Sequence, residues 1–353
     1  MSAEPLPTPF VAVDRARLLA NIDAMATHAR DLGMVLRPHA KTHKSAAIAR
    51  RQVQAGAVGL TVATVGEAEA FARYGFDDLF IAFPLWADAD RAHRLGHLLE
   101  QASVRVGVDS DESVAQLKPL AGERLSVLVE IDSGHRRSGV EPADAGRVAA
   151  AAAAAGLRVE GVFTFPGHAY AAGAPARAAA DEAKALADAA DAVHRVGLSC
   201  DVVSGGSTPS APAMSAGVLT EARPGVYVFG DAQQVALGST TVDRVALHVH
   251  ATVVSQAGGR VVLDAGSKVL GPESPDYVTG FGLLPEHPQA QILRLSEHHA
   301  VLDWAGQLPG VGSQVRIVPN HVCLTVNMVD TLIVLDDGTP SDTWPVIARG
   351  ANT

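Results

Sequence analysis

Residues 59–83 read GLTVATVGEAEAFARYGFDDLFIAF and contain two strand-like runs on either side of a helical pattern. The runs 59–63 and 79–83 are short and rich in apolar residues, as buried strands are. Between them, residues 66–73 are rich in alanine and glutamate, a composition that favours a helix. A strand, a helix and a second strand in this order predict two parallel strands joined by a helical crossover.

The same alternation extends from Met34 to Asp231 and gives eight strand-like runs in all. Eight repeats within about 200 residues are typical of a closed (β/α)8 barrel. An open doubly wound sheet would show about five or six strands and a glycine-rich phosphate turn after the first strand, and we find no such turn. We therefore predict an α/β chain with a TIM-like barrel. The six further runs are 34–37, 104–108, 126–131, 159–163, 201–203 and 226–229.

The pattern changes after about Thr240, where strand-like runs are separated by glycine and proline instead of by helical segments. This texture predicts a second, C-terminal β domain. We expect the barrel to span residues 15–240 and the β domain to span residues 241–353, with residues 1–14 adding a strand at 10–14. The runs that indicate the β domain are 246–254, 260–263, 300–302 and 314–318.

The composition of the 353 residues, with 48% hydrophobic and 19% charged residues, is that of a globular enzyme and excludes a mostly disordered chain. A net charge of −10 argues against nucleic acid or an anionic membrane as the main partner, because both require a basic surface. The N-terminus does not read as a signal peptide and no run of 18 apolar residues occurs, so we expect a cytoplasmic protein. Two cysteines, Cys200 and Cys323, do not make a disulfide framework.

Polar residues follow several of the predicted strands, at the end of a barrel where functional side chains gather. Lys41 follows the first run, between His39 and His43. A lone lysine is usually a solvated surface charge, but confinement at a strand end favours a nucleophilic amine. Further polar segments follow the fifth, sixth and seventh runs at 132–139, 166–170 and 204–209, and another, 223–227, lies at the eighth run.

Residues 204–208, Ser-Gly-Gly-Ser-Thr, combine two glycines with three hydroxyl groups. Consecutive backbone N–H groups in such a segment can form an anion nest, although a Gly-Ser segment by itself is more often an ordinary turn. Its position after the seventh run favours phosphate binding, since barrels commonly hold phosphate there.

His321 and Cys323 form a further pair of candidate ligands in the predicted β domain. In an extended segment they would project from the same face, and imidazole and thiolate together suit a soft divalent ion, with zinc favoured. Two protein ligands leave positions open, so the pair suggests a catalytic ion rather than a structural one. The alternative is a core cysteine beside a surface histidine.

Taken together, these motifs resemble the D-serine dehydratase and D-threonine aldolase group of pyridoxal-phosphate enzymes, which has an alanine-racemase-like barrel and a C-terminal β domain. The resemblance covers nearly the whole chain. Each motif is weakly specific by itself, and the combination is specific. The motifs are residues 37–44 (RPHAKTHK), 132–140, 167–168, 204–208 (SGGST), 223–229 (RPGVYVF) and 319–323 (PNHVC).

The resemblance implies that Lys41 carries pyridoxal 5'-phosphate as a Schiff base and that His43 assists catalysis. It also implies that His321 and Cys323 bind Zn2+, with Mn2+ or another divalent ion as an alternative. A D-amino acid substrate and a homodimer follow from the same resemblance. The remaining implied cofactor-binding residues are Arg137, His168, Tyr170, Ser204, Gly205, Gly206, Ser207, Thr208, Arg223 and Tyr227.

The identity of the second metal ligand separates two reactions within this group. Dehydratases of the group resemble this chain in pairing histidine with cysteine, whereas the aldolases typically pair histidine with aspartate and use a harder ion. Cys323 therefore favours a D-serine dehydratase, which releases pyruvate and ammonia. A D-threonine aldolase, which releases glycine and acetaldehyde, stays open, as do an amino-acid racemase and a non-catalytic cofactor carrier.

Overall fold

The computed structural model describes residues 6–353, which divide into two compact units. The barrel unit comprises Asp23–Lys41, Ala46–Gly225 and Gly350–Thr353. The β unit comprises residues 6–22 together with Thr42–Ser45 and Val226–Arg349. Every helix in residues 6–353 is too short or too polar to cross a membrane.

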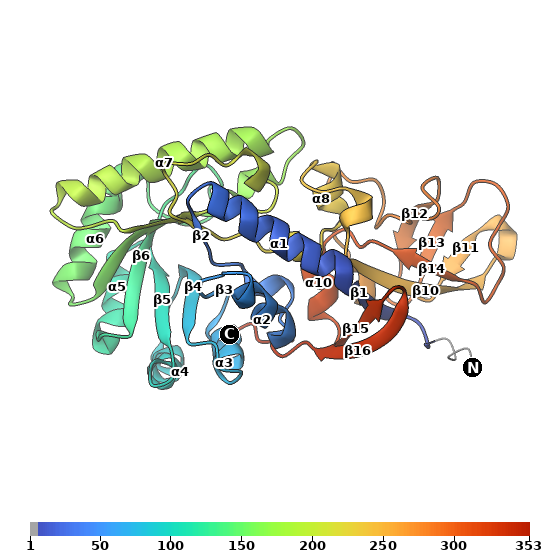
Figure 1. Ribbon diagram of the computed structural model, residues 1–353, viewed down its shortest axis with the longest axis horizontal. Helices are drawn as coiled ribbons and strands as arrows, with labels where there is room; N and C mark the ends of the chain where they lie inside the picture. Colours follow the sequence, from blue (N-terminus) through green and yellow to red (C-terminus); the bar gives the residue numbers. More distant parts are fainter. Residues whose placement is uncertain (1–5) are drawn as a thin grey trace. The chain divides into compact units, whose positions relative to one another are not determined.

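Eight parallel strands form the sheet of the barrel unit, in the order β2-β9-β8-β7-β6-β5-β4-β3 (Figure 1). A backbone bridge between His39 and Thr61 joins the segment after β2 to β3, so the two edges of this order meet. The predicted α/β barrel is therefore confirmed. The strands are β2 (Val35–Leu36), β3 (Leu60–Val62), β4 (Asp78–Pro84), β5 (Ser103–Val108), β6 (Leu125–Glu130), β7 (Arg158–Phe163), β8 (Val202–Gly205) and β9 (Glu221–Ala222).

Helices connect these strands, and alanine and glycine let two of them approach closely. A Cβ atom at Gly146 of α6 would lie 2.3 Å from the carbonyl oxygen of Ala192 in α7, so only glycine fits at this helix contact. Figure 1 shows the two helices side by side. The helices of the barrel unit are α2 (Ala46–Gln54), α3 (Val65–Ala72), α4 (Ala89–Leu99), α5 (Asp111–Leu117), α6 (Ala145–Ala154) and α7 (Pro175–Arg195), and α1 (Arg15–Asp31) contains the boundary between the units.

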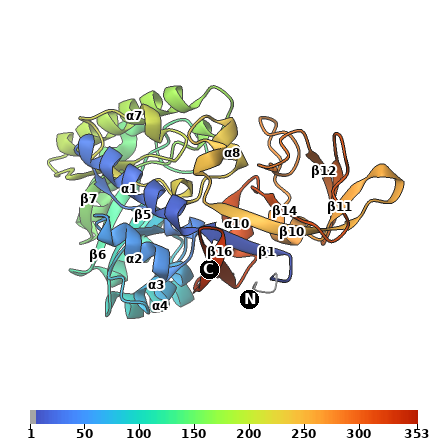
Figure 2. The ribbon, with the colours of Figure 1, turned by 45° about the vertical axis from the view of Figure 1, so that its right-hand side comes forward.

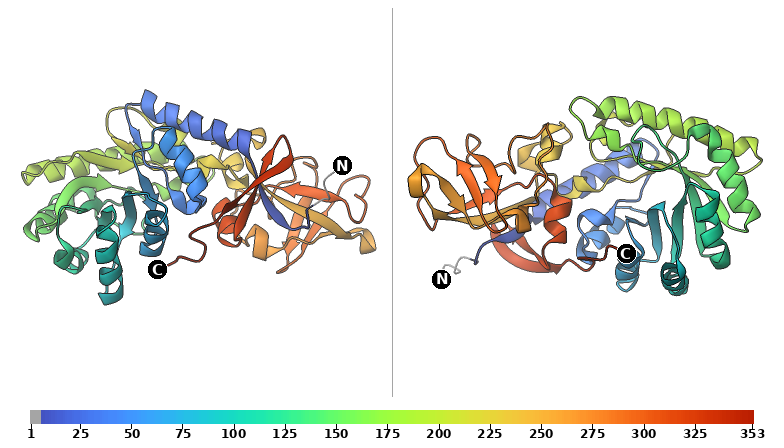
Figure 3. Two further views of the ribbon diagram at one scale, coloured as in Figure 1. Left: turned by 60° about the horizontal axis from the view of Figure 1, so that its bottom comes forward. Right: turned by 180° about the vertical axis from the view of Figure 1, so that it is seen from behind.

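Two hydrogen bonds hold the start of α3, the helix of the local βαβ pattern at 59–83. Thr64 caps α3, because its Oγ1 accepts the backbone N–H of Glu67 at 3.0 Å. The C-terminal residue Thr353 returns to the same helix, where its carbonyl oxygen accepts the N–H of Gly66 at 2.8 Å (Figure 3). The chain end thus belongs to the barrel unit.

The eighth strand predicted at 226–229 is wrong. The eighth strand is β9, whose Ala222 pairs with Leu36 and Gly205, and Val226–Val228 forms a 3-10 turn instead. Pro224 lies between the two segments and has no N–H with which to continue the ladder. The apolar run reflects the burial of the turn rather than strand pairing.

The β unit contains a mixed sheet in the order β12-β13-β11-β10-β1-β15-β16, with β14 paired to β10 (Figure 2). The strand predicted at 10–14 is β1 (Phe10–Asp14), which is antiparallel to β10 and parallel to β15. The other elements are β10 (Leu247–Ser255), β11 (Val261–Leu263), β12 (Gln291–Leu295), β13 (Ala300–Asp303), β14 (Gln314–Ile317), β15 (Thr331–Asp336), β16 (Thr339–Pro345), α8 (Ala232–Ala236), α9 (Ser267–Leu270) and α10 (Val322–Asn327).

Candidate active site

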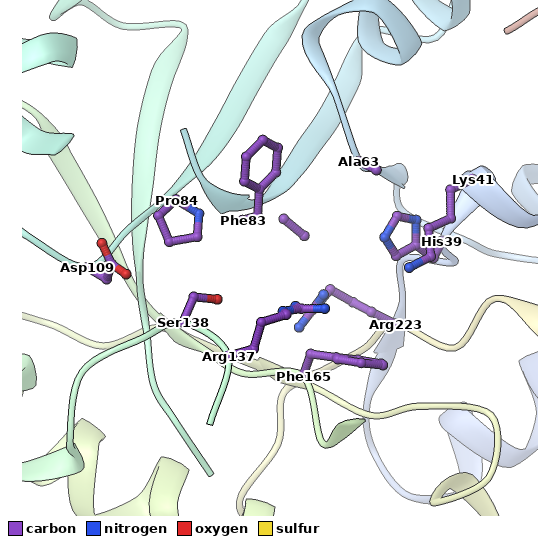
Figure 4. Close-up of a pocket in the computed structure, with 11 residues that line it drawn as sticks. His39, Lys41, Ala63, Phe83, Pro84, Asp109, Arg137, Ser138, Phe165 and Arg223 are labelled. Carbon is purple, nitrogen blue, oxygen red and sulfur yellow. The ribbon is translucent and has the colours of Figure 1, made fainter. Parts of the chain in front are cut away.

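A cavity of about 510 Å³ opens at the carboxyl ends of the barrel strands. Its size lies within the range of roughly 300–1,000 Å³ that small-molecule sites occupy. Figure 4 shows Lys41 and His39 on one side of the cavity and Pro84, Asp109 and Ser138 on the opposite side. The lining residues are His39, Lys41, Ala63, Ala82, Phe83, Pro84, Asp109, Arg137, Ser138, Phe165 and Arg223.

The amine of Lys41 lies beside an aromatic ring on the cavity wall. Lys41 belongs to a short 3-10 turn that follows β2, and its Nζ is 5.7 Å from the centre of the Phe165 ring. The guanidinium carbon of Arg137 lies 5.2 Å from the same ring centre (Figure 4). Both distances are within cation–π range, so one aromatic ring holds two cationic side chains at the cavity.

Arg223 lines the cavity, and its side chain is otherwise buried. Its Nε donates to Ser204 Oγ at 2.8 Å, and its guanidinium also donates to the carbonyl oxygen of Thr164. The rings of Phe80 and Phe163 lie 5.3 and 5.2 Å from its Cζ. Burial lowers the pKa of Arg223 to about 10, against the opposing charge of Glu221, so the side chain stays positive at neutral pH.

Glu130 is an acidic group near the cavity that the sequence analysis did not single out. It is the last residue of β6 and is buried, and burial raises the pKa of its carboxyl to about 7. A hydrogen bond with Ser138 and the charge of Arg137 oppose that rise. In the sequence, Glu130 is the single charged residue of the strand-like run 126–131.

The predicted phosphate turn, Ser204–Thr208, begins with the last two residues of β8. The N–H of Gly206 donates to Glu182 Oε1 at 2.6 Å, and the N–H of Ser207 donates to Ser210 Oγ at 3.0 Å. These two amides therefore have partners within the chain. The turn reaches the cavity wall through the bond between Ser204 and Arg223.

His168 and Tyr170 lie outside the residues that line the cavity. Tyr170 packs behind the wall, with its ring centre 6.2 Å from that of Phe165. His168 approaches α7, where its Nε2 is 3.5 Å from Asp181 Oδ2. The structure therefore brings Lys41, Arg137 and Arg223 together at one cavity, and it places the two aromatic candidates behind or beside that cavity.

His43, Tyr227, His321 and Cys323 belong to the β unit. His43 is buried, and its Nδ1 accepts the N–H of Ser45 at 3.1 Å, which leaves the proton of the neutral ring on Nε2. Tyr227 is buried within the 3-10 turn at Val226–Val228.

Residues 321–323 do not form a continuous extended segment, because a helix begins at Val322. His321 is the N-cap residue of α10 and Cys323 lies in its first turn. The buried carboxylate of Asp231 accepts the N–H of Val322 at 3.2 Å and so holds the helix start. The sequence signal for this helix was missed because its cap partner lies 91 residues away in the chain.

The side chains of His321 and Cys323 nevertheless meet. They hydrogen-bond to each other, and Cys323 Sγ lies 3.4 Å from Thr42 Oγ1. Burial lowers the pKa of His321, but Cys323 and the carboxylate of Asp231 outweigh that effect and raise the pKa to about 9. In the described part of the chain, no three His, Cys, Asp or Glu residues gather as a metal site.

Two family models match the chain. The model described as "Alanine racemase, N-terminal domain" matches residues 13–233, and the model described as "Putative serine dehydratase domain" matches residues 246–335. The first covers more than half of the chain and includes every residue of the cavity.

Relatives of known activity align along almost the whole chain. D-threonine aldolase of Arthrobacter sp. is 34% identical and covers 97% of this chain and 93% of its own. D-threo-3-hydroxyaspartate dehydratase of Delftia sp. strain HT23 is 34% identical and covers 91% of this chain and 92% of its own. The crystal structure of D-threonine aldolase from Filomicrobium marinum superposes with a TM-score of 0.89, at 34% identity, over 98% of this chain and 96% of that one.

Proposed function

The chain belongs to the alanine-racemase-like family of pyridoxal-phosphate-dependent lyases of D-hydroxy amino acids, and we propose that it dehydrates a D-β-hydroxy amino acid, with D-serine as the first substrate. The observation that carries the cofactor assignment is the position of Lys41, which lines the cavity at the strand ends together with Arg137 and Arg223. Such a site suits a small, negatively charged aldehyde cofactor.

The residues of the cavity fit pyridoxal phosphate. The cavity is large enough, its lysine amine can react with an aldehyde, and Arg137 and Arg223 balance negative charge. When bound, the cofactor supplies an electron-withdrawing ring that weakens the bonds at the substrate Cα. We assign the phosphate to Ser204–Thr208 with Tyr227, and contacts around the cofactor to Arg137, His168, Tyr170 and Arg223.

Lys41 has two tasks in the proposed reaction. Its amine would hold the cofactor, and during the reaction its Nζ would accept the proton from the substrate Cα. Phe165 keeps this amine at the cavity wall through the contact at 5.7 Å. His43 is proposed as a second proton carrier, since its neutral ring has its proton on Nε2.

The His321 and Cys323 pair is proposed to bind Zn2+, with Mn2+ or another divalent ion as an alternative. An imidazole and a thiol in contact are suitable zinc ligands once a metal ion has displaced their protons. Zinc held by this pair would supply Lewis-acid polarisation of a hydroxyl group. A variant of a relative, D-threo-3-hydroxyaspartate dehydratase, has been solved in what is described as its metal-free form.

A second candidate reaction is aldol cleavage of D-threonine. The observation that favours it is the likeness to D-threonine aldolases in both sequence and structure. Dehydration is preferred because the resemblance drawn from the sequence implies a dehydratase for a chain that pairs His321 with Cys323. We also propose that the protein is a cytoplasmic homodimer and that it has no nucleic-acid or membrane partner.

Product analysis distinguishes the two reactions. Purified protein loaded with pyridoxal phosphate and zinc is incubated with D-serine, D-threonine and D-threo-3-hydroxyaspartate, with L-serine as the stereochemical control. Keto acid and ammonia in equal amounts support dehydration, whereas glycine and an aldehyde without keto acid contradict it and support cleavage. A mixture of the D- and L-enantiomers without any lyase product would indicate a racemase, and absence of all turnover would indicate a carrier.

A further inference from the structure

Glu182 of α7 is a buried carboxyl group for which the proposed reaction has no use. Its side chain is almost completely inaccessible, at 1% exposure, and its Oε1 accepts the backbone N–H of Gly206 at 2.6 Å. Burial of a carboxyl group costs free energy unless hydrogen bonds within the protein replace those it made to water. The bond to Gly206 connects this group directly to the proposed phosphate turn.

Both glycines of the turn, Gly205 and Gly206, lie against this carboxyl group. A Cβ atom at Gly205 would lie 2.4 Å from Glu182 Oε1, so a larger residue there would displace the carboxyl group. Gly206 has a φ of +84°, in the left-handed region that favours glycine. Glycine is thus required at the two positions for different reasons. Gly205 leaves room for the Glu182 carboxyl group, and Gly206 adopts a positive φ.

The opposite side of the turn is held by the cavity wall. The N–H of Arg223 donates to the carbonyl oxygen of Gly205 at 2.7 Å, in addition to the bond between Arg223 Nε and Ser204 Oγ. The backbone at Gly205 and Gly206 is therefore fixed by Glu182 of α7 on one side and by Arg223, which follows β9, on the other.

We propose that Glu182 is a positioning residue for the cofactor phosphate: its carboxyl oxygen fixes the Gly205-Gly206 backbone, so that Ser207 and Thr208 keep one conformation toward the phosphate group. The inference rests on the proposed function, because it uses the phosphate site assigned there. It adds a residue from the outer helical layer that does not touch the cofactor.

Two substitutions at Glu182 separate the hydrogen bond from the charge. Glu182→Gln keeps an acceptor oxygen for the Gly206 N–H, whereas Glu182→Leu leaves that N–H buried without its acceptor. Asp188→Asn is the matched control, because Asp188 lies on the same helix with half of its side chain exposed and pairs only with Lys184 among the ion pairs of residues 6–353.

The probes are pyridoxal phosphate and pyridoxal, which differ only in the phosphate group. Binding of each to apoprotein is followed by the visible absorbance of the lysine-bound aldehyde. For Glu182→Leu we expect the affinity for pyridoxal phosphate to fall about tenfold or more, with a change of less than about twofold for pyridoxal. For Glu182→Gln and Asp188→Asn we expect both affinities to stay within about threefold of wild type.

Equal losses for the two probes in Glu182→Leu would overturn the inference, since a general structural defect affects both. An unchanged affinity for pyridoxal phosphate would overturn it as well, as would a Gln variant as weak as the Leu variant. In these cases wild-type turnover persists and the proposed function stands. A wild-type protein that binds neither probe contradicts both proposals.

Gly205→Ala keeps the test available if Glu182→Leu does not fold. The added methyl group would push against Glu182 Oε1, so we expect a selective loss of affinity for pyridoxal phosphate. The double variant Gly205→Ala with Glu182→Ala removes the clash, and the alanine at position 205 should then cost less affinity than it does alone. An equal cost in both backgrounds contradicts the inference.

Discussion

Arg223 Nε donates a hydrogen bond to Ser204 Oγ across 2.8 Å, and this bond connects the wall of the cavity to the end of β8. Ser204 in turn donates to Glu221 Oε1 at 2.6 Å. Arg37 and Arg105 also bind Glu221, so the barrel interior contains a connected network of buried charges. The barrel interior next to the cavity that Lys41 lines therefore contains charged side chains and is not purely apolar.

Substitution of Arg223 is expected to destabilise the fold. Arg223→Leu removes the bonds to Ser204 and Thr164 and leaves their oxygens buried, so the free energy of unfolding should fall by about 2–4 kcal/mol. Urea denaturation of the apoprotein measures this change. Arg177→Leu is the control, because that side chain is 85% exposed, and its cost should stay below about 0.5 kcal/mol. Equal costs for the two variants would contradict the network.

The contribution of Glu130 to the stability of the protein is expected to fall as the pH rises. Burial raises the pKa of Glu130 to about 7 from an ordinary value of 4.5. Between about pH 4.5 and pH 7 the Glu130 carboxyl keeps its proton in the folded chain and loses it in the unfolded chain. The contribution of Glu130 to the free energy of unfolding therefore decreases as the pH rises through this range. Glu130→Gln cannot lose a proton, so its stability relative to wild type should increase by about 1 kcal/mol or more between about pH 5 and pH 8.

Denaturation of both proteins at several pH values measures this difference. Glu100→Gln serves as the control, because the Glu100 side chain is 71% exposed and the substitution should leave the pH dependence unchanged. Parallel stability curves for Glu130→Gln and wild type would show that Glu130 keeps an ordinary pKa.

The metal proposal predicts a difference between the two cysteines. Cys323 contacts His321, whereas Cys200 lies in the barrel unit and contacts the backbone of Val202. Dialysis against zinc, followed by elemental analysis, should find bound metal in wild type and in Cys200→Ala but little in Cys323→Ala. Metal retained by Cys323→Ala, or its absence from wild type, would contradict the assignment.

The alternation of short apolar runs and helical segments was sufficient to predict the barrel, because parallel strands and crossover helices leave separate local patterns. Lys41 and Arg137 could be expected at one cavity for a related reason, since each follows a predicted strand and strand ends converge. Arg223 precedes the strand wrongly predicted at 226–229, and only the structure shows that it follows β9. Local patterns failed where distant partners decide the conformation. Asp231 starts a helix at Val322, and the strand paired to Leu36 is the two-residue β9.

Other parts of the site gave no local signal of their role. Phe165 is one apolar residue among many until the chain brings Lys41 and Arg137 to its ring. Glu182 reads as a solvated carboxylate in a long amphipathic helix, and only the fold places it against Gly205 and Gly206. These roles arise from contacts between residues that are far apart in the sequence.

The central claim is that Lys41 carries the cofactor. Reduction of the cofactor-loaded protein with borohydride, followed by peptide mass spectrometry, identifies the lysine to which the cofactor is attached. Lys44 is an internal control three residues away, because its Nζ donates to Asn327 Oδ1 at 2.7 Å. We expect a pyridoxyl group on Lys41 in stoichiometric amount. Attachment to Lys44 or to another lysine, or no attachment at all, would contradict it.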